Sequence, residues 1–200
     1  FSVGTTLKSG SVFGRRQHLS RQVAHESDPH EPVNAYGHSK VVGENLVNLL
    51  RSQRIPTAIA RLSNVYGSVN DHSDRVVPAF VGAALRGLPL RVEGASCSFD
   101  FTHIDDVADG LFRICQHLEQ TRTSLPPVQF VSGISTPLSS LATMIVRESG
   151  SSSIVEVGRP REFDVSAFSG SPLRAKDLLK WTPNVDLLTG LRRLIHDFRL

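Results

Sequence analysis

Cysteine, tryptophan and methionine are scarce in this 200-residue chain, which has two cysteines, one tryptophan and one methionine. Cys97 and Cys115 lack the spacing of metal ligands or of a disulfide framework, which suits a reducing cytosol. No apolar run approaches the ~20 residues that span a bilayer, and no signal peptide is visible. These absences predict a cytoplasmic protein with no metal site and no membrane-spanning helix.

Strong charge is also absent, since the formal net charge is only +3 and the pI is about 9.2. Basic residues form one small cluster within 15–21 and another within 192–199. Such clusters are more often solvated faces than nucleic-acid footprints, and no aromatic residues interleave the first one. We therefore expect no nucleic-acid partner. The chain has no internal repeat, and its length is enough for one substantial core.

The stretch NAYGHSK at 34–40 carries the clearest chemical signal. It opens a predicted helix that runs to about residue 54, where Ile55-Pro56 ends it. Tyr36 and Lys40 are four residues apart and so share a helix face. A free tyrosine titrates near pH ~10, and an adjacent cation lowers that pKa. The pair therefore suits a general acid/base that acts on a sugar or alcohol hydroxyl.

The rest of the chain predicts alternating helices and strands. The Tyr36 helix has one apolar stripe, formed by Val42, Leu46, Leu49 and Leu50. Strands are predicted at 57–62, 90–92, 99–104 and 128–132, and helices at 76–85, 105–118 and 138–149, with two closing helices after 173. Asp105 or Asp106 is expected to cap the second of these helices, and His103 is expected to pack.

Three further motifs accompany NAYGHSK: SGSVFG at 9–14, RLSNVYG at 61–67 and FTHIDDVADG at 101–110. In order and spacing they resemble the extended short-chain dehydrogenase/reductases, specifically the NAD-dependent nucleotide-sugar epimerases and dehydratases, from about Ser9 to the C-terminus. The resemblance implies an α/β fold, the C-terminal half of a Rossmann-like doubly wound parallel sheet with a small α/β substrate-binding domain. Residues 1–75 would belong to the Rossmann-like part and 76–200 mainly to the substrate-binding region. Segments near 100–132 would return to the Rossmann-like part.

The same resemblance assigns the catalytic groups. Tyr36 would remove a hydroxyl proton while hydride passes to the nicotinamide of NAD or NADP. Lys40 would lower the pKa of the tyrosine and hold the nicotinamide ribose, and Ser9 would position the reacting oxygen. The cofactor-binding set is Tyr36, Lys40 and the backbone near Leu62 and Ser63.

The substrate, by the same resemblance, is a nucleotide-sugar. Asn64 and Arg159 are assigned to it, together with Ser11, which is the reserve candidate for the catalytic serine. Glu26 matches an acidic residue of the family, and we interpret it as a solvated charge. A homodimer through the Tyr36 helix region is a further expectation.

The sequence departs from the family at Phe99, where these enzymes usually carry an arginine that clamps the diphosphate. A phenyl ring cannot form charge-assisted bonds. Either Arg91 or Arg75 substitutes, or the substrate lacks a nucleotide diphosphate. The second case favours a hydroxysteroid- or ketone-type dehydrogenase on the same scaffold.

The glycine fingerprint Gly-x-x-Gly-x-x-Gly, which holds the dinucleotide pyrophosphate, is expected about a hundred residues before the tyrosine. Only thirty-five residues precede Tyr36, so we expect a fragment of a longer parent that is inactive alone. The competing interpretation is a truncated, non-catalytic remnant or a binding module. The sequence leaves open the substrate, NAD against NADP, and epimerase against dehydratase, decarboxylase or reductase.

Overall fold

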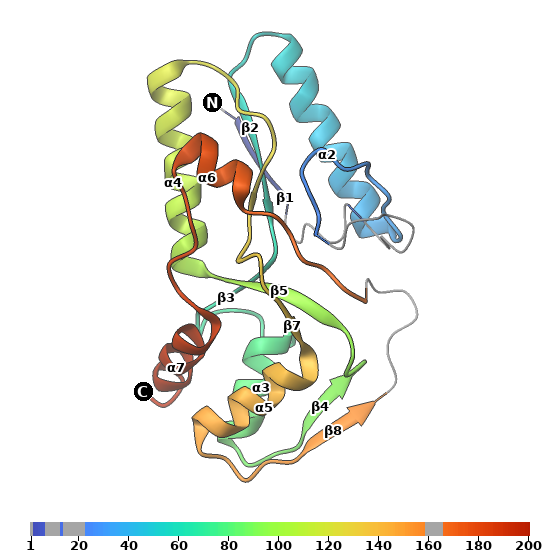
Figure 1. Ribbon diagram of the computed structural model, residues 1–200, viewed down its shortest axis with the longest axis vertical. Coiled ribbons are helices and arrows are strands. Elements are labelled where there is room, and N and C mark those ends of the chain that lie inside the picture. The colour runs from blue at the N-terminus through green and yellow to red at the C-terminus, as the bar shows by residue number, and fades with distance from the viewer. Residues whose placement is uncertain (1, 7–12, 14–22, 159–165) are drawn as a thin grey trace.

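The computed structural model describes residues 2–6, 13, 23–158 and 166–200. The molecule is elongated, with one region at each end of its long axis (Figure 1). The first, which we call the β2 region, contains β1 (Ser2–Thr6), β2 (Thr57–Leu62), β6 (Val128–Phe130), α2 (Ala35–Ser52), α4 (Ile104–Thr121) and α6 (Leu173–Leu179). The second, the α3 region, contains β3 (Asn64–Tyr66), β4 (Leu90–Glu93), β5 (Ser98–His103), β7 (Ser135–Pro137), β8 (Val155–Gly158), α3 (Val76–Leu85), α5 (Leu138–Ser149) and α7 (Leu187–Asp197).

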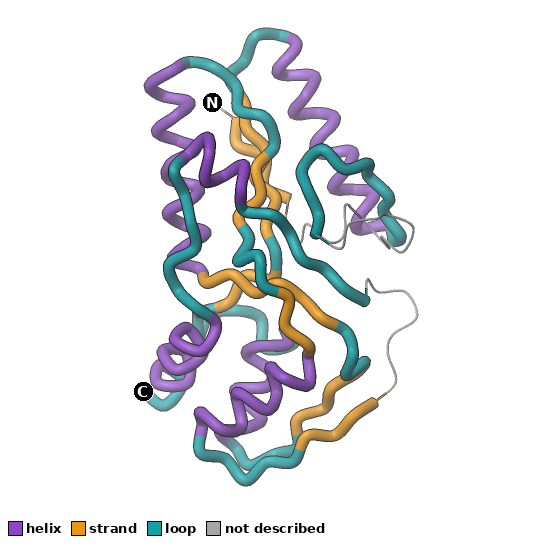
Figure 2. Tube along the Cα trace, viewed as in Figure 1, coloured by secondary structure: helices purple, strands orange, loops and turns teal. Residues whose placement is uncertain are grey.

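The β2 region is a parallel sheet in the order β1-β2-β6. Ser2 pairs with Thr57 and Ala60 pairs with Val128. Helix α2 covers one face of this sheet, and α4 and α6 cover the other (Figures 1 and 2). Every residue of β2 is buried, as expected for a parallel strand with helices on both faces. The predicted α/β class with a parallel sheet is therefore confirmed.

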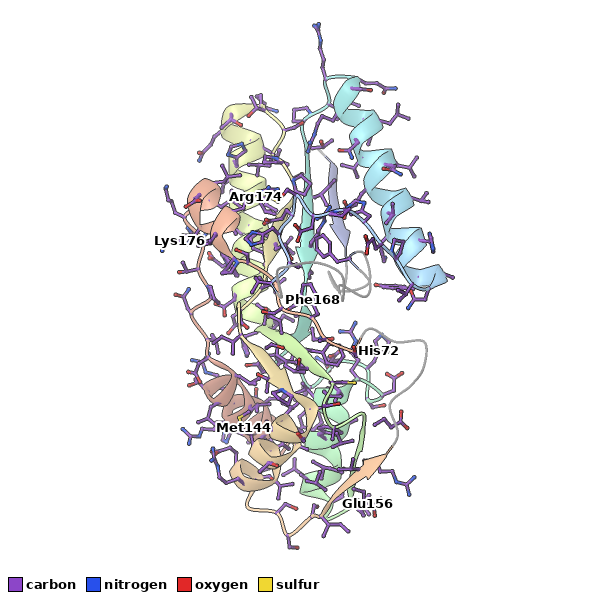
Figure 3. All side chains as sticks on the ribbon, turned by 45° about the vertical axis from the view of Figure 1, so that its right-hand side comes forward. His72, Met144, Glu156, Phe168, Arg174 and Lys176 are labelled. Carbon is purple, nitrogen blue, oxygen red and sulfur yellow. The ribbon has the colours of Figure 1, made fainter. Side chains whose placement is uncertain are left out.

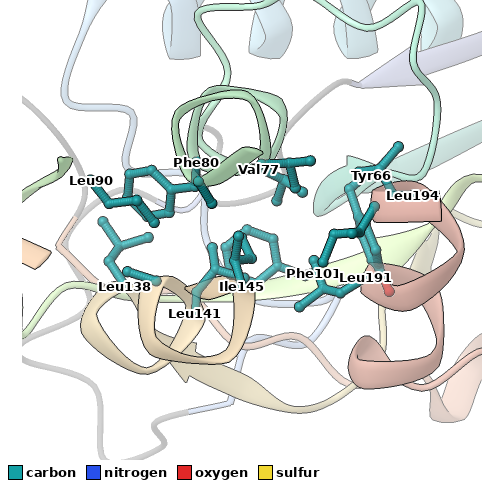
Figure 4. Close-up of a cluster of buried hydrophobic side chains, with 14 of the residues drawn as sticks. Tyr66, Val77, Phe80, Leu90, Phe101, Leu138, Leu141, Ile145, Leu191 and Leu194 are labelled. Carbon is teal, nitrogen blue, oxygen red and sulfur yellow. The ribbon is translucent and has the colours of Figure 1, made fainter. Parts of the chain in front are cut away.

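The α3 region has two small sheets. In one of them β3 runs parallel to β5, and β5 pairs antiparallel with β7. In the other, β4 runs parallel to β8. Helices α3, α5 and α7 pack together over an apolar cluster (Figure 4). Its buried members include Tyr66, Val77, Phe80, Leu90, Phe101, Leu138, Leu141, Ile145, Leu191 and Leu194.

Helices α3 and α5 match their predicted ranges, because their apolar side chains repeat at helical spacing and face this cluster. The predicted cap of α4 is wrong. His103 is its N-cap, and the imidazole Nδ1 accepts a hydrogen bond from Asp105 N. Asp106 instead accepts bonds from the backbone nitrogens of Asn184 and Val185 at 2.9 and 3.0 Å. The second carboxylate therefore fastens the C-terminal segment to α4.

Helix α2 turns most of its apolar stripe away from the sheet. Val42, Leu46 and Leu49 are 57%, 59% and 56% exposed, whereas Glu44 and Val47 face the sheet. The periodicity identified an amphipathic helix correctly, but the apolar stripe does not face the sheet. Within the described ranges, no helix is both long and apolar enough to cross a membrane.

Candidate active site

Tyr36 lies in the first turn of α2, where the local sequence fixes the start of the helix. Asn34 is the N-cap, with extended backbone, and its Oδ1 accepts a hydrogen bond from Gly37 N at 2.8 Å. This bond satisfies one of the backbone N–H groups that a helix start leaves unpaired. The Ser39 hydroxyl donates to the Tyr36 carbonyl at 2.8 Å. The position of the phenol therefore follows from a defined helix start.

Lys40 lies one turn beyond Tyr36, as predicted, and its Nζ is 4.9 Å from the centroid of the Tyr36 ring. The ammonium of Lys40 thus lies over the aromatic ring of Tyr36. The expected lowering of the tyrosine pKa is not found. Partial burial raises the pKa of Tyr36, and the guanidinium of Arg75 opposes this shift. Tyr36 is 41% exposed, and its phenol is protonated at neutral pH.

The predicted cofactor-side residues Leu62 and Ser63 are both buried at the end of β2. Ser63 Oγ shares a 2.8 Å hydrogen bond with Thr102 Oγ1. The hydroxyl of Ser63 is therefore engaged within the protein. In an α/β sheet, ligands collect beyond the carboxyl ends of the strands, and this is such an end.

Asn64 begins β3, directly after this strand end. Its Nδ2 donates to the Asp100 carbonyl at 3.5 Å, a long bond that leaves most of the amide's hydrogen-bonding capacity for another partner. The Asp100 side chain is fully buried and accepts bonds from Ser132 N and Gly133 N, each at 2.8 Å. Burial raises the pKa of Asp100, and the backbone bond from Ser132 opposes the shift. Asp100 thus holds the loop that follows β6.

Phe99, the departure from the family pattern, lies among aromatic rings. It is half-buried and packs against the cluster of Phe13, Ala24, Val131 and Phe168 as well as against the apolar cluster of the α3 region. The rings of Phe13 and Phe168 stack with centroids 6.5 Å apart, and Phe168 lies between the two ends of the molecule (Figure 3). Arg91, one proposed replacement for the missing arginine, is exposed and within 3.5 Å of Glu156 on the β4–β8 sheet.

Three predicted site residues, Ser9, Ser11 and Arg159, lie outside the described residues. A cavity of about 460 Å³ lies elsewhere, between residues 25–27 and α6, and includes Arg174 and Asp177 in its lining. None of the predicted site residues that the structure describes lines it. The described ranges contain no group of three or more side chains suited to holding a metal ion.

Sequence reasoning missed a buried cluster of charged residues next to the site. Glu26, which we expected to be a solvated charge, is only 7% exposed. Its Oε1 accepts a bond from Gln129 N at 2.9 Å. Arg61 and Glu44 are buried as a pair. One signal was available, because Arg61 interrupts an apolar run in a buried strand and a buried charge requires a partner.

The sequence matches the NAD dependent epimerase/dehydratase family over residues 5–125. The chain belongs to this family. A putative UDP-glucose 4-epimerase of Methanocaldococcus jannaschii is 28% identical over 191 residues, which cover 94% of this chain and 59% of that protein. UDP-glucuronic acid decarboxylase 3 of Arabidopsis thaliana is 31% identical over 173 residues, 82% of this chain and 48% of that protein. The chain thus spans about half to three-fifths of the length of these family members.

Several solved structures share the fold of this chain. MoeE5 in complex with UDP-glucose and NAD superposes with a TM-score of 0.87 at 24% identity, covering 98% of this chain and 64% of that one. UDP-glucose 4-epimerase from Thermotoga maritima with UDP-glucose gives a TM-score of 0.84 at 22% identity, covering 98% and 63%. At these identities the likeness establishes the Rossmann-like fold.

Proposed function

We propose that the protein to which this chain belongs performs NAD(P)-dependent epimerase- or dehydratase-type chemistry on a nucleotide-sugar. The observation that carries the proposal is the pairing of Tyr36 and Lys40 on the first two turns of α2 in a member of this family. Relatives named as UDP-glucose 4-epimerase and UDP-glucuronic acid decarboxylase support the substrate class. Decarboxylation belongs to the same proposal. We also propose that residues 1–75 serve mainly the cofactor and 76–200 mainly the substrate, in the cytosol.

In this proposal Tyr36 is the general acid/base, and its phenol takes and returns the proton of a sugar hydroxyl. A raised pKa keeps the phenol protonated, so a cation near the oxygen is needed to make it a base. Lys40 and Arg75 are the described candidates. Ser9 would hold the reacting oxygen, while Ser11, Asn64 and Arg159 would orient the sugar nucleotide.

The residues present fit one end of a nicotinamide dinucleotide. Lys40 offers three donors to a ribose, and the buried strand end at Leu62 and Ser63 offers backbone groups. NAD, as bound by structural neighbours, would accept and return the hydride. The glycine fingerprint for the pyrophosphate is absent from the sequence. We therefore expect the isolated chain to bind NAD more weakly than the micromolar range in a calorimetric titration, and micromolar binding would contradict this.

The deciding experiment uses a longer form of the protein that carries a glycine fingerprint before this chain, and it compares the two tyrosines. Tyr36→Phe should lower kcat by ~10²–10⁴-fold, because it removes the proton carrier, and should leave cofactor binding nearly intact. Tyr66→Phe is the matched control, since its buried hydroxyl donates only a long 3.4 Å bond to the Leu187 carbonyl. Equal turnover by Tyr36→Phe and the unmodified enzyme would exclude Tyr36 from the mechanism.

Phe99 supports a second candidate, a hydroxysteroid- or ketone-type dehydrogenase on the same scaffold. The rings around Phe99 form an apolar surface, on which an arginine would be buried without a partner. Phe99→Arg should improve or preserve binding of a nucleotide-diphosphate sugar, but it should abolish activity on an apolar ketone. Activity confined to apolar ketones would therefore replace the nucleotide-sugar proposal.

We further propose that α2 mediates a homodimer. Its exposed Val42, Leu46 and Leu49 form a continuous apolar stripe, since residues spaced i, i+4 and i+7 share a helix face. Leu46→Glu should shift the sedimentation of the protein to that of a monomer. Phe112→Glu on α4, which changes a single exposed ring, should not. A protein that is monomeric before any substitution would contradict the proposal.

A further inference from the structure

A single arginine, Arg61, connects the elements that surround the Tyr36–Lys40 pair. It lies on β2, one position before Leu62, and only 2% of its side chain is exposed. A guanidinium in such a place is stable only if its donors are satisfied, because an unpaired buried charge costs several kcal/mol. The partners of Arg61 therefore show which elements it joins.

The first partner is Glu44 on α2. Arg61 Nε donates to Glu44 Oε1 at 2.9 Å and Nη2 donates to Oε2 at 2.7 Å. Two parallel bonds fix the orientation of the Glu44 carboxylate relative to the guanidinium as well as the distance between them. Tyr36, Lys40 and Glu44 are spaced i, i+4 and i+8, so they follow one another along one face of the helix. The guanidinium thus holds the same row of side chains that carries the proposed catalytic pair.

The remaining donors of Arg61 hold the loop before α2. Nη1 donates to the Glu26 carbonyl at 3.0 Å and Nη2 donates to His30 Nε2 at 2.7 Å. Burial and the Arg61 charge lower the pKa of His30, and the Glu44 carboxylate opposes them. A neutral His30 can accept this bond. The Phe13 ring covers the guanidinium, with its centroid 4.9 Å from Cζ.

We propose that Arg61 is a positioning residue that acts through Glu44 to set the register of α2 against the end of β2. The inference rests on the proposed function, because it concerns the placement of Tyr36 and Lys40 relative to residues 62–64. A slip of one helical turn moves a side chain by ~5.4 Å and would break both bonds to Glu44. Misplacement by about 1 Å can cost ~10²-fold in rate, so such a clamp bears directly on catalysis.

The test uses the 200-residue chain itself and needs no activity. The chain has two tyrosines, and burial raises the pKa of Tyr66 far above the ordinary range, with the Asp186 and Asp106 carboxylates adding to the shift. With the tyrosine Cζ atoms labelled with carbon-13, the NMR titration near the ordinary value of about 10 therefore reports Tyr36 alone. Tyr66 is an internal control, because the two resonances titrate together only when the chain is unfolded.

The main variant is Arg61→Met with Glu44→Met, which replaces a buried ion pair by apolar side chains of similar length and often leaves stability unchanged. We expect Tyr66 to remain resistant to titration while the pKa of Tyr36 falls toward that of a free tyrosine, because α2 is no longer held to β2 and its first turn exposes the phenol. If the double variant does not fold, Glu44→Gln, which keeps the shape of the side chain, should shift the Tyr36 pKa in the same direction.

Arg51→Met is the matched control. Arg51 is also on α2, but at its far end, where Nε donates to Thr57 Oγ1 at 3.2 Å and Nη2 donates to the Leu125 carbonyl. We expect Arg51→Met to remove these bonds of α2 without changing the pKa of Tyr36. An unchanged Tyr36 pKa in the folded Arg61 and Glu44 variants, or an equal fall in Arg51→Met, would overturn the inference. Neither result bears on the turnover test of Tyr36→Phe, so the two proposals fail separately.

Discussion

Helices α2 and α4 each have 18 residues and lie on opposite faces of the same parallel sheet, yet they are built in opposite ways. Helix α4 buries Val107, Ile114 and Leu118 against the sheet. Helix α2 buries a glutamate there and exposes its apolar stripe. Both have an amphipathic sequence. Periodicity therefore identifies a helix and its apolar face, but it does not identify what that face contacts.

The largest expected difference concerns the buried carboxylate. Glu44→Leu leaves Arg61 buried without its carboxylate, which should cost about 3–5 kcal/mol of unfolding free energy. Glu119→Gln on the exposed side of α4 should change stability by less than about 0.5 kcal/mol. Urea unfolding followed by circular dichroism would measure both. Equal effects would mean that the charged contact of α2 is solvated.

Truncation of an apolar side chain should have the opposite result, with the larger loss of stability on α4 and the smaller one on α2. Ile114→Ala on α4 removes a fully buried side chain and should cost about 2–5 kcal/mol. Leu46→Ala on α2 should cost less than about 0.5 kcal/mol in the monomer. The same urea experiment at low protein concentration compares them. A stability loss for Leu46→Ala that grows with protein concentration would indicate the α2 dimer instead.

One glycine from each helix gives a third comparison, in which the two substitutions have opposite signs. A Cβ on Gly110 of α4 would lie 2.6 Å from Cε1 of the buried Phe130 ring, so Gly110→Ala should cost about 1–3 kcal/mol through overpacking. Gly43 of α2 has no described atom within 4 Å of such a Cβ. Gly43→Ala should therefore stabilise the helix by about 0.5–1 kcal/mol. Thermal unfolding of the two variants would check the signs.

The smallest effect is on the pH dependence of stability. The pKa of His30 is lowered in the folded chain from an ordinary 6.5, so the unfolded chain binds the proton more readily. Stability from this residue is present above pH 6.5 and declines as the pH falls below it. Urea unfolding between pH 7 and 5 should show a shallower decline for His30→Gln than for the unmodified chain. Identical pH profiles would mean that His30 does not bond Arg61.

Secondary structure was largely predictable because it depends on local patterns. The range 57–62 is apolar except for Thr57 and Arg61, and it forms a buried strand. The one-turn spacing of Tyr36 and Lys40 predicted their contact correctly. The raised pKa of Tyr36 was not predictable, because burial causes it and outweighs the opposing effect of Arg75, which is thirty-nine positions away.

The partners of the buried charges depend on tertiary structure in the same way. Arg61 contacts Glu26, His30 and Glu44 only after the sheet and α2 have packed. Glu26 was expected to be solvated because its neighbours in the sequence are polar. His103 was expected to pack, and its ring does contact Tyr66 edge-on. Its capping of α4 was missed because aspartates are the more common caps.

The fluorescence of the single tryptophan should report on the segment that joins the two regions of the molecule. Trp181 is fully buried, meets the Phe130 ring edge-on with centroids 4.9 Å apart, and donates from Nε1 to the Asp106 carbonyl at 2.8 Å. Helix α7, which follows it, packs in the other region. The Trp181 indole thus lies in the segment between α6 and α7, which connects one end of the molecule to the other. Its emission should shift to longer wavelength when this passage opens, even if each end keeps its helices.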